Sequence, residues 1–318
     1  MAEPLKAAAA AVERAETIVT IGHIGPDGDA LGSALGLAMA ARNAGKNAYA
    51  TFGAPFALAT EFEFLDQSAL VAPGEVPAEI DVAVACDTAA AERLGSAYPI
   101  TERAETVIVV DHHLSNEGFG DIAYVDPEAA ATTQLVFYLL RELDWPLSPP
   151  VAEALYTGLV TDTGRFQYSS TSPEVHRVAA ELLAAGVDVA AVGQRLFEEA
   201  PFGYYELASR VLARAELEIE EDLVWSVMFA EDLTAAGLPY QESDPLIDLV
   251  RIAREAGVAC LLKEIEPGTF KGSLRSRGAV DVAAVAKELG GGGHHNAAGF
   301  TIEGPVEKAM MRVRELLP

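Results

Sequence analysis

The chain has 318 residues, of which 50% are hydrophobic and 22% are charged, as expected of a folded globular protein. Lys and Arg number 22 and Asp and Glu number 48, so the net charge of −26 argues against binding to long nucleic acid or to an anionic membrane. Two cysteines, and no apolar run of about 20 residues that could span a bilayer, predict a cytoplasmic protein without a disulfide framework.

The first half of the chain alternates short apolar strands with helices. Strand patterns occur at 17–22, 47–52, 82–86 and 106–110. Helical patterns occur around the alanine run 7–11 and at 30–44, 132–143, 150–160 and 173–185. This alternation predicts an α/β domain with a doubly wound parallel sheet over residues 1–186. Ligands of such sheets bind beyond the carboxyl ends of the strands.

The second half begins with a helical pattern without strands at 187–216, which we interpret as a helical linker. A smaller α+β domain with a mixed sheet is then predicted over 217–318. Its expected strands are 217–220, 223–229, 258–265, 269–276 and 299–302, and its expected helices are 245–255 and 282–289. A length of about two typical domains agrees with this division.

Acidic and histidine residues gather just after the strands of the first domain. They are His23, Asp27 and Asp29 after the first strand, Asp87 after the third, Asp111, His112 and His113 after the fourth, and Asp162 between two helical segments. Imidazole and carboxylate together suit divalent metals such as manganese. Carboxylates crowded on one rim would repel one another, so bound cations are the natural compensation.

Each of these residues also has a structural interpretation. Asp29 could cap the helix that follows, and so could Asp27 with a less ideal spacing. Asp87 and Asp111 end strands, where aspartate often makes a turn. Four such coincidences on one rim are improbable, and we therefore favour the metal site.

The second domain carries its own cluster. Alternation along the predicted strand at 269–276 places Ser273, Arg275 and Arg277 on one face. The run Gly290–Gly293 before His294 exposes backbone that a phosphate can approach closely. The structural alternatives are a helix cap with a flexible connector, and an ordinary surface arginine.

These residues together resemble the DHH phosphoesterase superfamily, which is named for its Asp-His-His motif, here Asp111-His112-His113. The second domain resembles the DHH-associated domain of the RecJ and nanoRNase branch through Gly291–His294 and Ala297–Gly299. Length and domain order are similar to the NrnA-like enzymes, which are bifunctional oligoribonucleases (nanoRNases) and 3′-phosphoadenosine-5′-phosphate (pAp) phosphatases.

The resemblance implies two divalent metal ions, Mn²⁺ with Mg²⁺ as the alternative. One ion would bind His23, Asp27 and Asp87, and the other would bind Asp29, Asp87, His112 and Asp162. His113 would face the phosphate as a catalytic residue, and Asp111 would orient a histidine. The substrate would be bound by Asn116, Ser273, Arg275, Gly292, Gly293 and His294, with His295 leaving open which ring reaches it.

The function implied is hydrolysis of short oligonucleotides (nanoRNA, pApA), pAp or cyclic di-AMP by a water that bridges two metals, in a chain that could form a homodimer. One alternative is an inorganic pyrophosphatase, whose family carries a basic motif in place of the glycine–histidine run. Another is a non-catalytic nucleotide-binding regulator, which would require a lost ligand residue.

Overall fold

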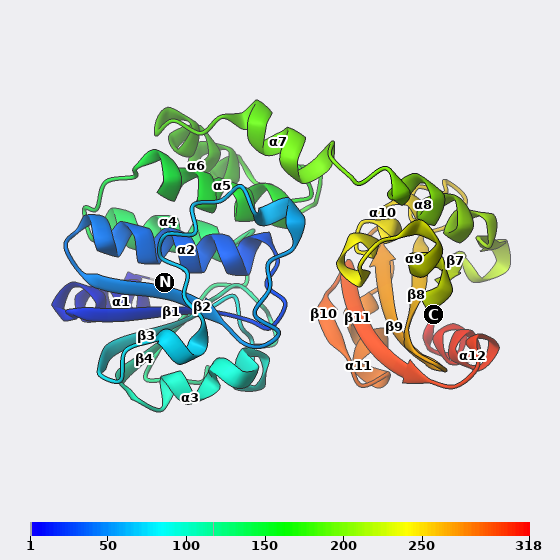
Figure 1. Ribbon diagram of the computed structural model, residues 1–318, viewed down its shortest axis with the longest axis horizontal. Coiled ribbons are helices and arrows are strands. Elements are labelled where there is room, and N and C mark those ends of the chain that lie inside the picture. The colour runs from blue at the N-terminus through cyan, green and yellow to red at the C-terminus, as the bar shows by residue number, and fades with distance from the viewer. Residues whose placement is uncertain (1, 117) are drawn as a thin grey trace. The chain divides into compact units, whose positions relative to one another are not determined.

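The apolar strands of the first half pair side by side in the computed structural model, which describes residues 2–116 and 118–318 (Figure 1). The chain forms two units, one ending at Glu199 and the other beginning at Ala200. The elements of the first unit are α1 (Ala2–Arg14), β1 (Thr17–Gly22), α2 (Gly28–Asn43), β2 (Asn47–Phe52), β3 (Ile80–Cys86), α3 (Tyr98–Thr101), β4 (Ala104–Asp111), β5 (Ile122–Val125), α4 (Thr132–Glu142), α5 (Pro149–Asp162), α6 (Pro173–Ala184) and α7 (Val189–Phe197).

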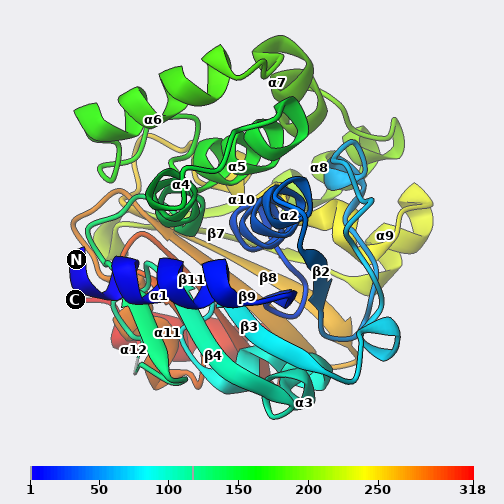
Figure 2. The ribbon, with the colours of Figure 1, turned by 90° about the vertical axis from the view of Figure 1, so that its left-hand side faces the viewer.

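The strands of the first unit form a parallel sheet in the order β2-β1-β3-β4-β5. The strand order reverses direction between β1 and β3, which lie side by side in the sheet. The carboxyl ends of these two strands therefore flank the crevice in which sheets of this kind bind ligands. Helices α2 and α4 cover one face, with α5 packed on both of them, and α3 lies against the other face (Figure 2). Successive side chains of a strand point to opposite faces of the sheet, so one strand contributes to the hydrophobic core on each face. Ile18 packs in the core on the first face, and Val19 packs in the core on the second.

Close packing of α2 on α5 requires glycine. A Cβ atom at Gly32 would lie 2.3 Å from the carbonyl oxygen of Ala154, and one at Gly36 would lie 2.8 Å from a methyl group of Leu155. The two helices can therefore approach only where α2 lacks side chains. This contact fixes α2, which follows the first strand, against α5, whose last residue is Asp162.

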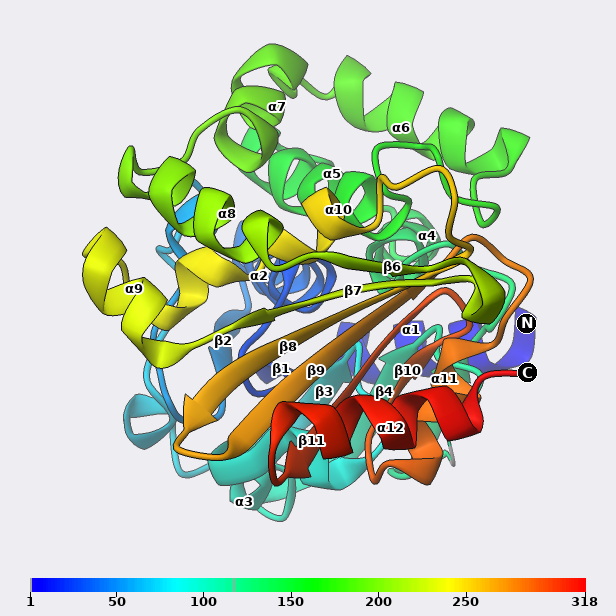
Figure 3. The same ribbon diagram turned by 90° about the vertical axis from the view of Figure 1, so that its right-hand side faces the viewer.

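The second unit contains a mixed sheet in the order β10-β11-β9-β8-β7-β6, in which β7 and β8 are parallel and the other pairs antiparallel. Helices α8–α10 lie on one face and α11 and α12 on the other (Figure 3). Its elements are α8 (Gly203–Ala213), β6 (Glu216–Glu218), β7 (Leu223–Met228), α9 (Ala230–Ala236), α10 (Leu246–Val250), β8 (Val258–Glu266), β9 (Thr269–Ser276), α11 (Val282–Glu288), β10 (Gly292–His294), β11 (Ala297–Glu303) and α12 (Val306–Leu316).

The fold class expected from the sequence is confirmed, with four local differences. The 187–216 segment is two helices, α7 and α8, and contributes one to each unit. The helix expected at 245–255 is confined to α10, and strand β10, which includes the last two glycines of the run, was not expected. Elements α3, β5, α9 and α12 were not expected either. Within the described residues, none of the helices has both the length and the apolar character that crossing a membrane requires.

Candidate metal centre

The acidic and histidine residues singled out in the first half of the sequence meet at one edge of the parallel sheet. His23 follows β1, Asp87 follows β3, and Asp111 ends β4 just before His112 and His113. Parallel strands bring these ends together, and α2 and α5 add the remaining members, Asp27, Asp29 and Asp162. We call these eight residues the carboxylate–histidine cluster.

The first group in the cluster surrounds His23. Its Nε2 atom lies 3.7 Å from Oδ2 of Asp27 and 3.7 Å from Oδ2 of Asp87. Its Nδ1 atom lies 3.0 Å from the carbonyl oxygen of Ile24, which can only accept a hydrogen bond. The proton of a neutral ring is therefore on Nδ1, and the lone pair of Nε2 faces the two carboxylates.

The second group surrounds His112. Its Nε2 atom lies 3.3 Å from Oδ2 of Asp162, 3.5 Å from Oδ1 of Asp87 and 3.8 Å from Oδ2 of Asp29. Its Nδ1 atom lies 3.2 Å from the carbonyl oxygen of Ala129, which fixes the same tautomer as at His23. Three carboxylate oxygens and one imidazole nitrogen thus converge from two loops and two helices.

Asp87 belongs to both groups. Its Oδ2 atom faces His23, whereas its Oδ1 atom faces His112 and accepts a hydrogen bond of 2.9 Å from the hydroxyl of Thr132. The backbone of Asp87 is left-handed, with φ of 55°, and its amide donates to the carbonyl of Val110 at 2.9 Å. Aspartate tolerates this conformation better than most residues, and the turn aims the carboxylate between the two groups.

Of the two helix caps considered in the sequence, the structure shows Asp27 in that role and not Asp29. Asp27 caps α2, because its Oδ1 atom accepts from the amides of Asp29 and Ala30 at 3.1 and 3.0 Å. The interpretation of Asp29 as the cap is therefore wrong. Asp29 is buried and instead accepts from the amides of Thr132 and Thr133, at the start of α4, at 2.6 and 2.8 Å. The helix start stabilises its negative charge.

Asp111 holds two neighbours in place. Its Oδ1 atom accepts from Nδ1 of His113 at 2.7 Å, and its Oδ2 atom accepts from the amide of Asn116 at 2.6 Å. Asn116 also donates to the carbonyl of Thr88 at 3.2 Å and accepts from Gly118 at 2.7 Å. Its side-chain amide is thus engaged on both sides, which favours a positioning role over the phosphate contact expected from the sequence.

Burial and charge repulsion raise the pKa of two carboxylates in the cluster. Burial raises the pKa of Asp87 well above its ordinary value, and the neighbouring carboxylates, with Asp29 first, raise it further. The pKa of Asp162 is raised in the same way. Burial also acts to raise the pKa of Asp111, but its hydrogen bond with His113 and the charge of that ring outweigh burial and lower it. A cation among these carboxylates would remove the repulsion.

Three supporting residues were missed by the sequence analysis. Thr132 and Thr133 hold Asp87 and Asp29, and Gly158 of α5 makes room for them. A Cβ atom at Gly158 would lie 2.4 Å from Cγ2 of Thr133 and 2.8 Å from Oδ1 of Asp29. The available signal was a glycine inside a helical pattern, which commonly has a packing reason.

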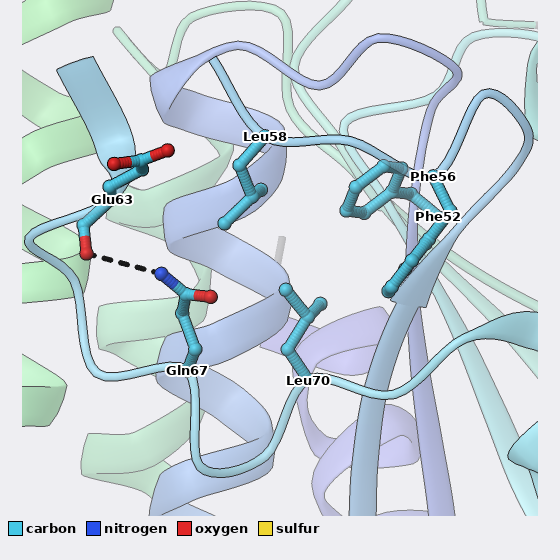
Figure 4. Close-up of a pocket in the computed structure, with 6 residues that line it drawn as sticks. All are labelled: Phe52, Phe56, Leu58, Glu63, Gln67 and Leu70. Atoms are coloured by element: carbon cyan, nitrogen blue, oxygen red, sulfur yellow. Dashed lines mark hydrogen bonds between the residues drawn. The ribbon is translucent and has the colours of Figure 1, made fainter. Parts of the chain in front are cut away.

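A cavity of about 390 Å³ lies elsewhere in the first unit, beside the end of β2 (Figure 4). It is lined by Phe52, Phe56, Leu58, Glu63, Gln67 and Leu70. The rings of Phe52 and Phe56 stack with centroids 4.5 Å apart, and Gln67 donates to the carbonyl oxygen of Glu63 at 3.1 Å. None of these six residues belongs to the carboxylate–histidine cluster.

The residues predicted to bind substrate in the second unit lie on β9, β10 and the turn between β10 and β11. Ser273 and Arg275 are half-buried on one face of β9, while Arg277 lies beyond the strand and donates to the carbonyls of Arg251 and Ala253. Gly292 is exposed, with open space where a side chain would be. The side chain of His294 lies outside the described residues.

The glycine run also has a packing reason that the sequence analysis missed. A Cβ atom at Gly291 would lie 2.0 Å from the carbonyl oxygen of Gly299, and one at Gly293 would lie 2.5 Å from that of Ala297. Gly293 also has a φ of 146°. The run therefore lets β10 approach β11 closely, whatever it contributes to ligand binding.

Comparison with known proteins defines the class. Residues 17–159 match the DHH family, N-terminal domain, and residues 230–317 match the DHHA1 domain. Over 92% of its length, the chain is 37% identical to the bifunctional oligoribonuclease and PAP phosphatase NrnA of Thermus thermophilus, and the alignment covers 86% of that protein. Over 68% of its length, it is 30% identical to the cyclic-di-AMP phosphodiesterase GdpP of Geobacillus thermodenitrificans, and the alignment covers 32% of that protein.

Two solved structures share the fold of this chain. An exopolyphosphatase-related protein from Bacteroides fragilis superposes with a TM-score of 0.89 at 26% identity, covering 100% of this chain and 96% of that one. RecJ of Thermus thermophilus in complex with Mn²⁺ shares the fold, with a TM-score of 0.58 at 15% identity over 98% of this chain and 54% of that one. The fold and the matches define a hydrolase of phosphoester bonds. The chain belongs to the DHH family, which confirms the resemblance drawn from its motifs.

Proposed function

We propose that this chain hydrolyses short oligonucleotides (nanoRNA and pApA), pAp or cyclic di-AMP in the cytoplasm. The observation that carries the proposal is Asp87, whose two carboxylate oxygens face two separate histidine-containing groups. The similarity to NrnA over most of both chains, and to GdpP over two thirds of this one, supports the substrate class. The matched DHHA1 domain favours it over the pyrophosphatase alternative.

Divalent metal ions fit the residues present. The nitrogen–oxygen separations of 3.3–3.8 Å in the two groups exceed ordinary hydrogen bonds, and the facing atoms are imidazole lone pairs and carboxylate oxygens. Residues proposed to hold one ion are His23, Asp27 and Asp87, and those proposed for the other are Asp29, Asp87, His112 and Asp162. Mn²⁺, which the RecJ relative binds, is the proposed ion and Mg²⁺ the alternative. When bound, such ions polarise a phosphoester and lower the pKa of a water molecule.

His113 is proposed to act on the substrate through its Nε2 atom. Its Nδ1 atom donates to the ionised carboxylate of Asp111, so a proton stays on that nitrogen. Nε2 is then the atom that can hold a proton near the leaving oxygen of a phosphoester. Asp111 fixes the orientation of the ring, and Asn116 holds Asp111 from the other side.

The second unit is proposed to bind substrate through Ser273, Arg275, Gly292, Gly293 and His294. Arg275 supplies a guanidinium that can pair with phosphate oxygens, and exposed Gly292 offers an amide. A homodimer stays a prediction, which the mass of the particle in solution tests. Cys86 and Cys260 are buried and free, as a cytoplasmic enzyme requires.

A panel of pAp, pApA, cyclic di-AMP and pyrophosphate, each with Mn²⁺ and followed by product analysis, tests the proposal. We expect AMP and phosphate from pAp, and AMP from pApA. Turnover of pyrophosphate alone would instead identify a pyrophosphatase. Binding of the nucleotides without turnover of any of them would identify a regulator.

A further inference from the structure

The cavity beside the end of β2 has no part in the function described so far, and we call it the aromatic pocket (Figure 4). Its volume of about 390 Å³ falls within the range of small-molecule sites, about 300–1,000 Å³. Phe52 is buried, whereas Phe56, whose ring stacks on it, is 39% exposed. Leu58 and Leu70 are half-buried and complete the apolar lining. A flat apolar ligand can therefore reach Phe56 from solvent and stack beside it.

Gln67 gives the aromatic pocket one polar group of fixed orientation. Its Nε2 atom donates to the carbonyl oxygen of Glu63 at 3.1 Å, and because a carbonyl can only accept, turning the amide over would lose this bond. The Oε1 atom is left on the side of the pocket, as Figure 4 shows. This acceptor favours a ligand that carries an N–H donor. The exocyclic amine of adenine is such a donor, and a glutamine amide is one of its usual partners.

The charges around the aromatic pocket disfavour the phosphate end of a nucleotide. Glu63 is the one charged residue among the six that line the pocket, and none of the six is a cation. A carboxylate repels a phosphate, whereas an uncharged base meets no such repulsion. The lining therefore favours the base of a nucleotide over its phosphate.

The aromatic pocket lies at the same edge of the sheet as the carboxylate–histidine cluster. Phe52, the last residue of β2, pairs with Gly22, and His23 follows Gly22 in the chain. A Cβ atom at Gly53 would lie 3.2 Å from Cγ1 of Ile24, the residue after His23. A nucleotide with its base in the pocket can thus direct its phosphate toward the cluster.

One short helix fixes the loops that follow β1 and β2. It is a 3₁₀ helix over Ala91–Ala97. The carbonyl of Arg93 accepts from the amide of Ile24 at 2.9 Å, and the hydroxyl of Ser96 accepts from the amide of Ala54 at 2.7 Å. The spacing between the aromatic pocket and the first histidine of the cluster is therefore set by the fold, as positioning of a substrate requires.

We propose that the aromatic pocket binds the adenine base of the nucleotide substrate, stacked beside Phe56 and hydrogen-bonded through its exocyclic amine to Oε1 of Gln67. The proposal rests on the proposed function and adds a base specificity to it. Hypoxanthine has a carbonyl oxygen where adenine has the amine, so two acceptors would face each other. The chain should therefore prefer pAp over inosine 3′,5′-bisphosphate, and both over ribose 3′,5′-bisphosphate, which has no base.

The test compares kcat and KM on these three bisphosphates, with Mn²⁺, for the intact protein and for two pocket variants. Phe56→Ala should lower kcat/KM on both nucleotides by about five- to a hundredfold, chiefly through KM, and leave the ribose compound nearly unchanged. Gln67→Met should remove the preference for pAp over the inosine analogue. Because Gln67 is exposed, Gln67→Met tests the pocket even if Phe56→Ala fails to fold.

Two matched controls remove similar groups outside the aromatic pocket. Tyr98 of α3 is 39% exposed, as Phe56 is, and Gln241 of the second unit is exposed, as Gln67 is. Tyr98→Ala and Gln241→Met should leave the order of the three bisphosphates and their KM values unchanged. Equal losses on pAp and on ribose 3′,5′-bisphosphate in Phe56→Ala, or no loss on either, would overturn the pocket.

Equilibrium binding of adenosine in EDTA, up to the solubility limit of the nucleoside, separates failure of the aromatic pocket from failure of the proposed function. If the wild type hydrolyses none of the bisphosphates but binds adenosine, and Phe56→Ala weakens this binding, the function is wrong and the pocket stands. Absence of adenosine binding by the wild type, as expected of a pocket that receives an apolar side chain of a partner protein, contradicts it. Binding that neither pocket variant alters also contradicts it.

Discussion

Asp87 has three properties that are each unfavourable in the absence of a ligand. It is buried, it lies among other carboxylates, and its backbone adopts a left-handed conformation with φ of 55°. Each property costs stability, and none would be retained for packing alone. Together they aim one carboxylate at two imidazole-containing groups, so the local cost is explained by a function of the carboxylate.

This cost predicts how the stability of the metal-free protein changes with pH. The pKa of Asp87 is raised in the folded state, so the folded protein binds more protons here than the unfolded chain does. The contribution of Asp87 is fully present below its unfolded pKa and is lost as pH rises through the folded one. Asp87→Asn, measured in EDTA by denaturant unfolding, should therefore gain stability over the wild type as pH rises.

Asp144→Asn is the matched control, because Asp144 has a similar φ of 53° but is exposed. Its stability difference from the wild type should stay constant with pH. A constant difference for Asp87→Asn as well would contradict the electrostatic account of the carboxylate–histidine cluster.

At the scale of elements, the site depends on helices that approach one another unusually closely. Asp29 on α2 receives its hydrogen bonds from the start of α4, and Gly158 of α5 lies against both. Three helices from separate parts of the chain thus set the position of one carboxylate. The packing of these helices is part of the site, because Gly158 and Thr133 position Asp29, although neither is itself proposed to bind a metal ion.

Gly158→Ala tests this dependence. The new methyl group would meet Thr133 and Asp29 at 2.4–2.9 Å, so we expect a loss of about 1–3 kcal/mol in stability and weaker Mn²⁺ binding. The control is Gly193→Ala in α7, where a Cβ atom meets nothing within 4 Å. That variant should gain about 0.5–1 kcal/mol from helix propensity. Unchanged Mn²⁺ affinity in Gly158→Ala would contradict the claim that the metal site depends on this helix packing.

Sequence patterns predicted the elements whose residues have strong preferences of their own. The strands at 17–22, 47–52 and 269–276 agree residue for residue with β1, β2 and β9. Strand β10 was missed because Gly292 and Gly293 have little strand propensity, and it exists only through pairing with β11. The same limit applies to the site, since hydrogen bonds such as Thr132 to Asp87 join residues 45 positions apart.

At the scale of the whole molecule, charge is the dominant feature. The net charge of −26 repels polyanions, whereas Lys271 and Arg275 lie on one face of β9 in the second unit. Local attraction and overall repulsion together favour a ligand with few phosphates. Long-range repulsion grows with each added phosphate, whereas these two cations can neutralise only a limited number.

Hydrolysis should therefore fall steeply with chain length. We expect kcat/KM to be highest on dinucleotides and lower by more than about tenfold on a long single strand, with the difference narrowing as salt screens the repulsion. Rates on a series of oligonucleotides of one base composition, at two salt concentrations, measure both effects. Equal or faster cleavage of the long strand would contradict this account.

The most direct test of the central claim, that Asp87 serves two metal sites, is a titration of Mn²⁺ into metal-free wild type, Asp87→Asn and Asp144→Asn. The account predicts two bound ions in the wild type and in Asp144→Asn. It predicts weakened binding of both ions in Asp87→Asn, with turnover reduced by more than about a hundredfold, a larger effect than removal of an outer partner gives. Retention of one ion at wild-type affinity, or near-native turnover at saturating Mn²⁺, by a folded Asp87→Asn protein would contradict it.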